Sequence, residues 1–210
     1  TGVQTCALPS SGGASVFAEA GAEVIAHADS AARMAAEQPP LLAERKTAWP
    51  VGTLFFDAVP AAPTRLVTEP LELPLGGVRA VVRPCGPAHT PGDLRVDLPD
   101  VGVVVTGDLV FHGYHPNLEH ADLDGWRRGL GELLREPAET VFVPGHGAPG
   151  GREIVEAQAA WFDALEEAVE EARRSGAGAA GAEAALCARF PGYRLGACAA
   201  EAVKARFGGV

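Results

Sequence analysis

The sequence predicts an α/β fold in which several short strands precede long amphipathic helices. Hydrophobic residues make up 47% of the 210 residues, a share typical of a globular protein with a sizeable core. Four β-rich runs follow one another between residues 71 and 108, and apolar residues recur at helical spacing after residue 122. These observations favour one domain that contains both a sheet and helices.

The N-terminal part contains one predicted strand and one predicted helix. Residues Glu23–Ala26 form a short buried run, and Asp29 or Ser30 is a suitable N-cap for the helix that follows. Prolines recur between residues 39 and 70, and no regular hydrophobic period runs through that stretch. We expect a long surface loop over 39–69, of the kind that often lines a site.

Short strands are predicted next, because β-rich runs alternate with turn residues. These runs are LELPL (71–75), VRAVVRP (78–84), LRVDLP (94–99) and VGVVVTGD (101–108). A tight turn over Pro99–Gly102 joins the last two runs. A further buried strand lies in ETVFVPGHG (139–147) and runs into a glycine turn.

The C-terminal half is predicted to be helical. An amphipathic helix is expected over residues 122–136, because Trp126, Leu130 and Leu133 fall on one face. A long helix is expected over Arg152–Arg174, followed by a flexible hinge in SGAGAAGAE (175–183). Two short helices are expected to close the chain; they cover Ala182–Arg189 and Ala197–Arg206.

Composition excludes several classes of partner. The formal net charge is -10 and the 17 Lys and Arg residues are scattered, which argues against nucleic acid and anionic membranes. No apolar run approaches the ~20 residues that span a bilayer. The four cysteines lack a Cys-x-x-Cys pairing, which favours a reducing cytoplasm. We therefore expect a small-molecule substrate; the oligomeric state is left open.

Three polar residues follow predicted strands and have glycines nearby: His89, Asp108 and His146. Glycine permits close backbone approach, so that a neighbouring side chain can be aimed at a point outside the sheet. Neutral imidazole and carboxylate suit zinc, manganese or iron. We therefore predict that these three side chains converge in a metal site. His115 is expected on its rim as a substrate contact, whereas His27 is expected to be structural.

This ordered set resembles the metallo-β-lactamase superfamily. Residues 88–111 are similar to its His-Thr-Pro-Gly turn, paired strands and Gly-Asp strand end, and VFVPGHG (141–147) is similar to its closing turn. The similarity extends from about residue 11 to at least residue 161. It implies an αββα sandwich, in which His89 completes one metal's ligand set, Asp108 bridges two metals and His146 completes the second set.

The resemblance also implies a chemistry. Asp108 is similar to the bridging aspartate of hydroxyacylglutathione hydrolases and lactonases, whereas many antibiotic-hydrolysing members place Cys or Ser there. The implied function is hydrolysis of an ester, thioester or lactone with two zinc ions, iron or manganese being alternatives. Two other interpretations stay open. One is a mononuclear iron persulfide dioxygenase of the same fold, and the other is a degenerate, non-enzymatic binding module.

The family's His-x-His-x-Asp-His signature is absent, although SGGASVF (11–17), which it normally precedes, is present. Residues 1–9 resemble a translated sequencing-adapter oligonucleotide. We therefore expect residues 1–10 to be non-native, and residues 11–174 to form a partial domain that lacks its N-terminal strands. Residues 175–210 would be a helical extension of that domain. A chain without the signature is expected to be inactive and to bind zinc poorly.

Overall fold

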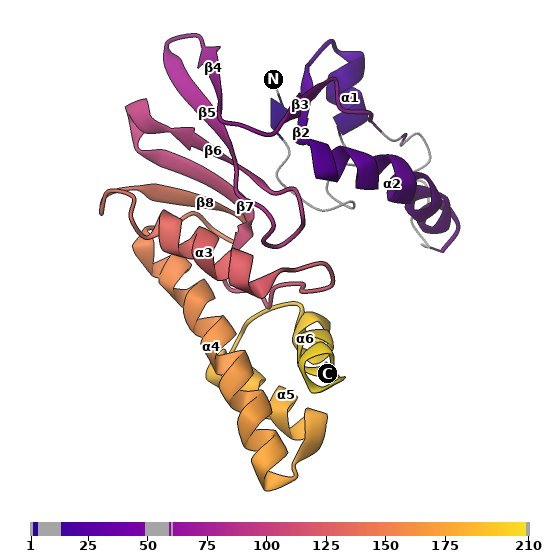
Figure 1. The fold of residues 1–210 in the computed structure, drawn as a ribbon, viewed down its shortest axis with the longest axis vertical. Coiled ribbons are helices and arrows are strands. Elements are labelled where there is room, and N and C mark those ends of the chain that lie inside the picture. The colour runs from indigo at the N-terminus through magenta and orange to yellow at the C-terminus, as the bar shows by residue number, and fades with distance from the viewer. Residues whose placement is uncertain (1, 4–13, 49–58, 60, 209–210) are drawn as a thin grey trace.

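The protein is an α/β sandwich of helices and two sheets (Figure 1). The computed structural model describes residues 2–3, 14–48, 59 and 61–208. One sheet has five strands and the other has three within these residues. The predicted α/β fold class is therefore confirmed.

The five-stranded sheet carries most of the predicted strands. Its members, in spatial order, are β4 (Leu71–Leu75), β5 (Val78–Pro84), β6 (Leu94–Leu98), β7 (Val103–Phe111) and β8 (Val141–His146). Neighbouring strands are antiparallel except β7 and β8, which are parallel. The predicted turn between β6 and β7 is a 3-10 turn, η3 (Pro99–Val101). Gly102 ends η3 in the left-handed conformation, with a φ of 63°.

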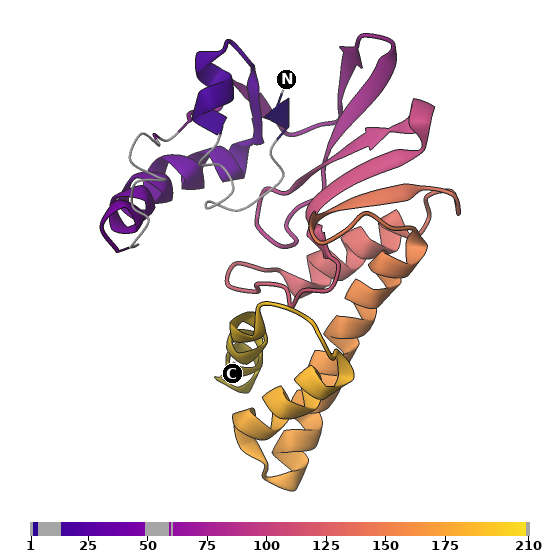
Figure 2. The ribbon, with the colours of Figure 1, turned by 180° about the vertical axis from the view of Figure 1, so that it is seen from behind.

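A smaller parallel sheet forms the N-terminal unit. Its strands are β1 (Gly2–Val3), β2 (Val24–His27) and β3 (Arg65–Val67), accompanied by helices α1 (Ala14–Glu19) and α2 (Ala28–Ala48). This unit lies beside the five-stranded sheet in both ribbon views (Figures 1 and 2).

The loop predicted from residue 39 onwards begins later than expected. Helix α2 continues through Pro39 and Pro40 to Ala48. Both prolines are exposed, and the following residues, LLAERKTA (41–48), are mostly good helix formers. The helix propensity of the residues after the prolines therefore outweighs the loss of the backbone N–H donors of Pro39 and Pro40. Residues 49–58 and 60 of the predicted loop lie outside the described residues, and its last part contains strand β3 (Arg65–Val67), so the loop prediction is wrong there too.

Four helices form the C-terminal layer. They are α3 (Leu123–Leu133), α4 (Arg152–Ser175), α5 (Gly178–Arg189) and α6 (Gly196–Gly208). The predicted hinge at 175–183 is wrong for most of its length, because α5 begins at Gly178. Gly176 ends α4 in the left-handed conformation, and the alanine-rich residues after it form a new helix.

The main core lies between the five-stranded sheet and this helical layer. Trp126 and Trp161 are fully buried in it, and Trp126 lies on the apolar face predicted from its helical spacing. The indole Nε1 of Trp126 donates a hydrogen bond to the carbonyl oxygen of Leu109 at 2.7 Å, which ties α3 to β7. The core therefore fixes the strand that carries Asp108 against the helices.

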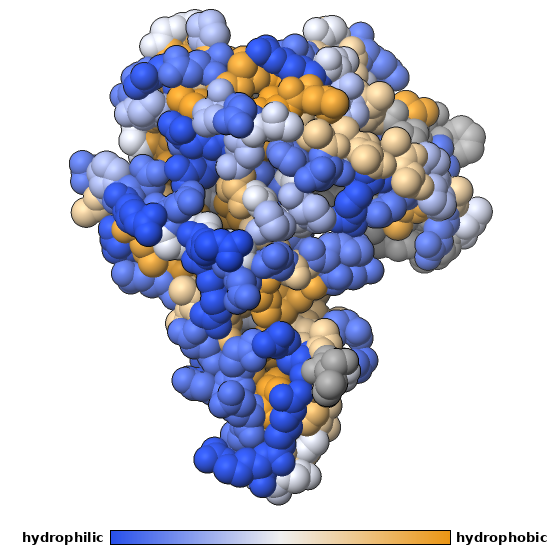
Figure 3. Space-filling view, viewed as in Figure 1, coloured by the Kyte–Doolittle hydropathy of each residue, from blue (hydrophilic) through white to orange (hydrophobic). Residues whose placement is uncertain are grey.

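The surface of the helical layer is mostly hydrophilic, whereas broader hydrophobic patches appear over the strands at the top of the view (Figure 3). Val16, Phe17 and Leu66 in the N-terminal unit are among the exposed large hydrophobic residues. Within the described ranges, no helix has the length and apolar character needed to cross a membrane.

Two glycines of α3 provide a test of how closely this helix packs on the loop that carries His89. A Cβ at Gly125 would collide with the backbone oxygen of Pro87 and lie 3.1 Å from its carbonyl carbon. A Cβ at Gly131 would meet nothing within 4 Å. We expect Gly125→Ala to lower the free energy of unfolding by about 1–3 kcal/mol, although alanine is the better helix former.

Gly131→Ala in the same helix is the matched control, and it should raise the free energy of unfolding by up to about 1 kcal/mol. Urea denaturation of the three proteins measures both effects. Equal stabilisation by the two substitutions would show that α3 does not press on the His89 loop.

Candidate metal centre

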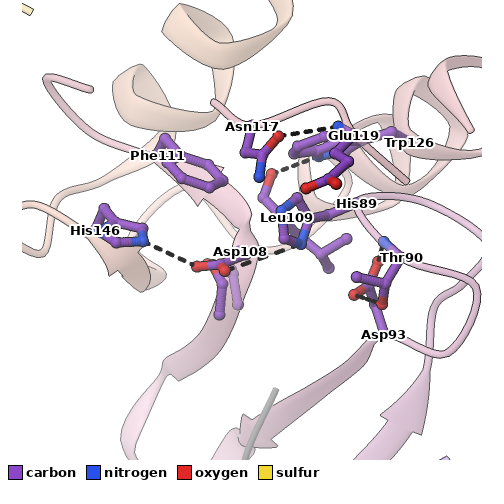
Figure 4. A network of polar contacts seen from close by, with 12 residues as sticks. His89, Thr90, Asp93, Asp108, Leu109, Phe111, Asn117, Glu119, Trp126 and His146 are labelled. Atoms are coloured by element: carbon purple, nitrogen blue, oxygen red, sulfur yellow. Dashed lines mark hydrogen bonds and ion pairs between the residues drawn. The ribbon is translucent and has the colours of Figure 1, made fainter. Parts of the chain in front are cut away.

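The three predicted ligands converge from three separate segments. His89 lies in the loop after β5, Asp108 in β7 and His146 at the end of β8. The Nδ1 atom of His89 is 3.9 Å from one carboxylate oxygen of Asp108, and Nε2 of His146 is 3.7 Å from the other. Figure 4 shows the carboxylate between the two imidazole rings. The predicted convergence is therefore observed, while the metal-binding role stays a prediction.

Asp108 lies inside a strand rather than after its end. Strand β7 continues to Phe111, and its pairing with β8 changes register on both sides of Gly107. Gly107 has a φ of 55°, a left-handed conformation that a bulge of this kind favours. The bulge re-aims the following side chain. It therefore directs Asp108 toward the histidines, although the strand itself does not end there.

A compact turn holds His89. The backbone nitrogen and the hydroxyl of Thr90 donate hydrogen bonds to the carboxylate of Asp93, at 2.8 and 2.6 Å. The hydroxyl of Ser30 in α2 donates to the carbonyl oxygen of Gly92 at 2.8 Å. The turn is thus fixed from inside by Asp93 and from outside by the N-terminal unit.

Residues after β7 position His146. Phe111 stacks on the His146 imidazole, with ring centroids 4.9 Å apart. The backbone nitrogen of His112 donates to the carbonyl oxygen of His146 at 2.9 Å. The Nδ1 atom of His112 lies 2.7 Å from the carbonyl oxygen of Ala148. Tyr114 lies on another side of His146, with ring centroids 5.5 Å apart. His112 and Tyr114 follow Asp108 within six residues in the sequence, but only the fold shows what they contact.

Burial favours the neutral form of His89. The side chains of His89 and Asp108 are 5% and 4% exposed, whereas that of His146 is 39% exposed. Burial lowers the pKa of His89, and the nearby Asp108 carboxylate opposes this shift. The neutral imidazole, which is the form that binds metals, is therefore favoured at His89.

The donor types, imidazole and carboxylate, are ones that suit a metal ion. The buried Nδ1 atom of His89 has no hydrogen-bond partner among the described residues, and a buried polar atom of this kind calls for a ligand, ion or water. The described residues contain no group of three or more His, Cys, Asp or Glu arranged to hold a metal ion. Asp108 lies between the two histidines, so each candidate ion position would have one imidazole and a share of the carboxylate. This arrangement matches the division between two metals that the family resemblance implies.

His115 is not on the rim of this cluster. It is 2% exposed; the indole Nε1 of Trp161 donates to its Nδ1 at 3.0 Å, and the Tyr193 ring packs against it. Burial lowers its pKa, which favours a neutral ring that can accept this hydrogen bond. The expected position of His115 on the rim is wrong, because its ring is buried and accepts the hydrogen bond from the Trp161 indole. A contact between His115 and substrate stays a prediction.

Asp93 gives the site a pH-dependent stability. Burial raises its pKa to about 6, although the hydrogen bonds from Thr90 oppose this. The folded state holds the proton of the Asp93 carboxyl more tightly than the unfolded chain does. The contribution of this proton to the free energy of unfolding is therefore full below about pH 4 and is lost as pH rises through about 6. We expect the difference in free energy of unfolding between the native protein and Asp93→Asn to fall across this range. Urea denaturation at several pH values measures it, and a flat or rising difference would contradict this assignment.

Comparison with known proteins identifies the family. The family model described as the metallo-beta-lactamase superfamily matches residues 11–146. A metallo-beta-lactamase from Pontibacter korlensis has 23% identity over 70% of this chain and 60% of its own, with a TM-score of 0.54. The metallo-beta-lactamase FIM-1 from Pseudomonas aeruginosa, in its mono-zinc form, has 25% identity over 70% of this chain and 57% of its own, with a TM-score of 0.51.

Curated protein sequences give no match. The chain spans about three fifths of the length of the two solved structures. The family match covers more than half of the chain. This protein belongs to the metallo-β-lactamase superfamily.

Proposed function

We propose that His89, Asp108 and His146 are metal ligands of a hydrolase that acts on an ester, thioester or lactone. One observation carries the proposal: a buried carboxylate lies 3.7 and 3.9 Å from two imidazoles that come from different segments. A carboxylate shared by two histidines is a suitable donor set for zinc. Membership of a superfamily of metalloenzymes supports the same interpretation.

His89 and Asp108 would hold one ion, and Asp108 and His146 would hold the other. Zinc is the first choice because FIM-1 was solved in a mono-zinc form, and iron and manganese accept the same ligands. A bound ion would lower the pKa of a water molecule and polarise the substrate carbonyl. Asp108 would supply negative charge to both ions, and burial favours the neutral His89 ring, which has a lone pair for a metal.

The surroundings favour catalysis on a small molecule. Phe111 and Trp126, both buried, pack against the histidine rings and exclude water from that side of the centre. His146 is the most exposed of the three ligands, so substrate would approach from its side. An aspartate at position 108, rather than Cys or Ser, supports an ester, thioester or lactone over a β-lactam.

The proposal is tested by supplying the ligands that this chain lacks. A designed segment carrying His-x-His-x-Asp-His would replace residues 1–10, directly before Ser11. The zinc-loaded fusion should hydrolyse at least one of 4-nitrophenyl acetate, acetylthiocholine and homoserine lactone, and the unmodified chain should not. Asp108→Asn in the fusion should abolish hydrolysis, because it removes the shared negative charge, whereas His120→Ala at the surface should leave the rate unchanged.

The same fusion separates the alternatives. Oxygen uptake with glutathione persulfide by an iron-loaded fusion, without ester hydrolysis, would favour the dioxygenase. A folded, metal-loaded fusion with neither activity would count against an enzyme and favour a binding module. Hydrolysis that survives Asp108→Asn would contradict the proposed ligand set.

A further inference from the structure

A glutamine of α4 holds the end of β7. The pairing of β6 with β7 ends at Val96 and Val105, whereas β7 continues to Phe111. The backbone nitrogen of His112 donates to β8, so the N–H of Phe111 points away from β8, toward the side where the pairing with β6 has ended. The Oε1 atom of Gln158 accepts a hydrogen bond from this N–H at 3.1 Å. Gln158 thus takes the place of a strand partner.

The ring of Phe111 packs against both histidines of the candidate metal centre. It stacks on the His146 imidazole at an interplanar angle of 15°, and its centroid lies 5.7 Å from that of the His89 ring. Figure 4 shows the Phe111 ring beside His146. Because Phe111 is buried in a close-packed core, its ring can shift little unless its backbone shifts. The hydrogen bond to Gln158 therefore fixes a ring that both candidate ligands contact.

Packing alone does not explain a glutamine at position 158. The residue is 2% exposed, and its Nε2 atom has no hydrogen-bond partner among the described residues. The amide cannot be turned round, because Nε2 would then face the N–H of Phe111 and both groups are donors. A buried donor without a partner lowers stability, and an apolar side chain of similar length would fill the space without that cost. The acceptor oxygen is thus the feature of Gln158 that the fold uses.

We propose that Gln158 is a positioning residue of the metal centre, which holds the Phe111 backbone so that the Phe111 ring keeps the His146 imidazole in one orientation. The proposal rests on the proposed function, because it concerns the same ligands. A ligand that is oriented before the ion arrives loses less freedom on binding. His146 gains most from such support, since its side chain is 39% exposed and that of His89 is 5% exposed.

The test follows the ring protons of His146 by NMR in the chain without metal. The stacked Phe111 ring shifts these signals, and Phe111→Leu shows their positions when the ring is absent. Gln158→Met removes the acceptor oxygen but keeps a side chain of similar length, so it should move the His146 signals toward their positions in Phe111→Leu. The backbone amide of Phe111 should also exchange with solvent at least about tenfold faster, because it has lost its hydrogen bond.

Val169→Ala is the matched control, because it removes buried atoms from the same helix about three turns further along. It should lower the stability without moving the His146 signals. Gln158→Glu should retain the native signals, because burial favours the neutral carboxyl, which still offers an acceptor oxygen. Unmoved His146 signals in Gln158→Met, or equal movements in Gln158→Met and Val169→Ala, would overturn the proposal.

One measurement needs no substitution. In the native chain, a scalar coupling between the Phe111 amide nitrogen and the side-chain carbonyl carbon of Gln158 should be detectable, because the two groups share a hydrogen bond. Absence of this coupling would overturn the proposal even if Gln158→Met did not fold.

Zinc binding separates this proposal from the proposed function. Gln158→Met should weaken the zinc affinity measured at His146 about tenfold, the usual effect of losing a residue that supports a metal ligand, and Val169→Ala should leave it unchanged. Equal zinc affinities in Gln158→Met and the native chain would reject the positioning role and retain the metal centre. A displaced His146 ring in Gln158→Met, with no zinc binding by the native chain, would reject the proposed function and retain only the orientation of His146 by Gln158.

Discussion

Trp126→Ala is expected to lower the free energy of unfolding by about 3–5 kcal/mol, the largest effect of any single substitution considered for this protein. Trp126 is fully buried and packs edge-on against His89 and Phe162, with ring centroids 5.2 and 5.0 Å away. The substitution also leaves the buried carbonyl oxygen of Leu109 without its indole donor. Urea denaturation measures the loss.

Trp126→Phe separates packing from hydrogen bonding. It retains an aromatic ring beside His89 but removes the donor to Leu109, so its cost should be clearly smaller than that of Trp126→Ala. A loss of less than about 1 kcal/mol for Trp126→Ala would show that α3 is not packed against β7 as described.

Gly145→Ala is expected to displace Asp108 and to abolish any metal binding that depends on it. A Cβ at position 145 would collide with a carboxylate oxygen of Asp108 and lie 2.8 and 2.9 Å from backbone atoms of Gly107 and Asp108. Because two of these neighbours are backbone, a side-chain rotation cannot relieve the contact, and β7 and β8 must move apart. The free energy of unfolding should fall by about 1–3 kcal/mol.

Gly196→Ala is the control for Gly145→Ala, since a Cβ there would meet nothing within 4 Å. It should change neither the stability nor the NMR signals of His89 and His146 appreciably. If Gly145→Ala leaves the signals of both histidines in place, Gly145 is not the residue that gives Asp108 its space.

Elements with strong local patterns were predictable from the sequence. Strands β5 to β8 and helices α3 and α4 have a clear hydrophobic period and turn residues at their ends, and the structure confirms them. The predictions were wrong where prolines or glycines, which favour loops, occur among residues that favour helices. Pro39 and Pro40 suggested a loop inside a helix, and glycines suggested a hinge where α5 begins.

The candidate site was predictable only in part, for a physical reason. Glycines lie near His89, Asp108 and His146 in the sequence, and the order of these three residues along the chain predicted their convergence. The burial of His115 and the pairing of Tyr114 with Arg194 depend on how the C-terminal segment packs on the loop after β7. No local pattern encodes such a contact between distant segments.

A zinc titration of the unmodified chain, followed through the imidazole NMR signals, tests the central claim most directly. Weak, saturable shifts are expected at His89 and His146, because each candidate ion position has fewer protein ligands than the three or four that tight zinc sites use. The signal of the surface residue His120 should not move, and Asp108→Asn should remove the shifts. Zinc that shifts His120 and leaves His89 and His146 unmoved would contradict the metal centre.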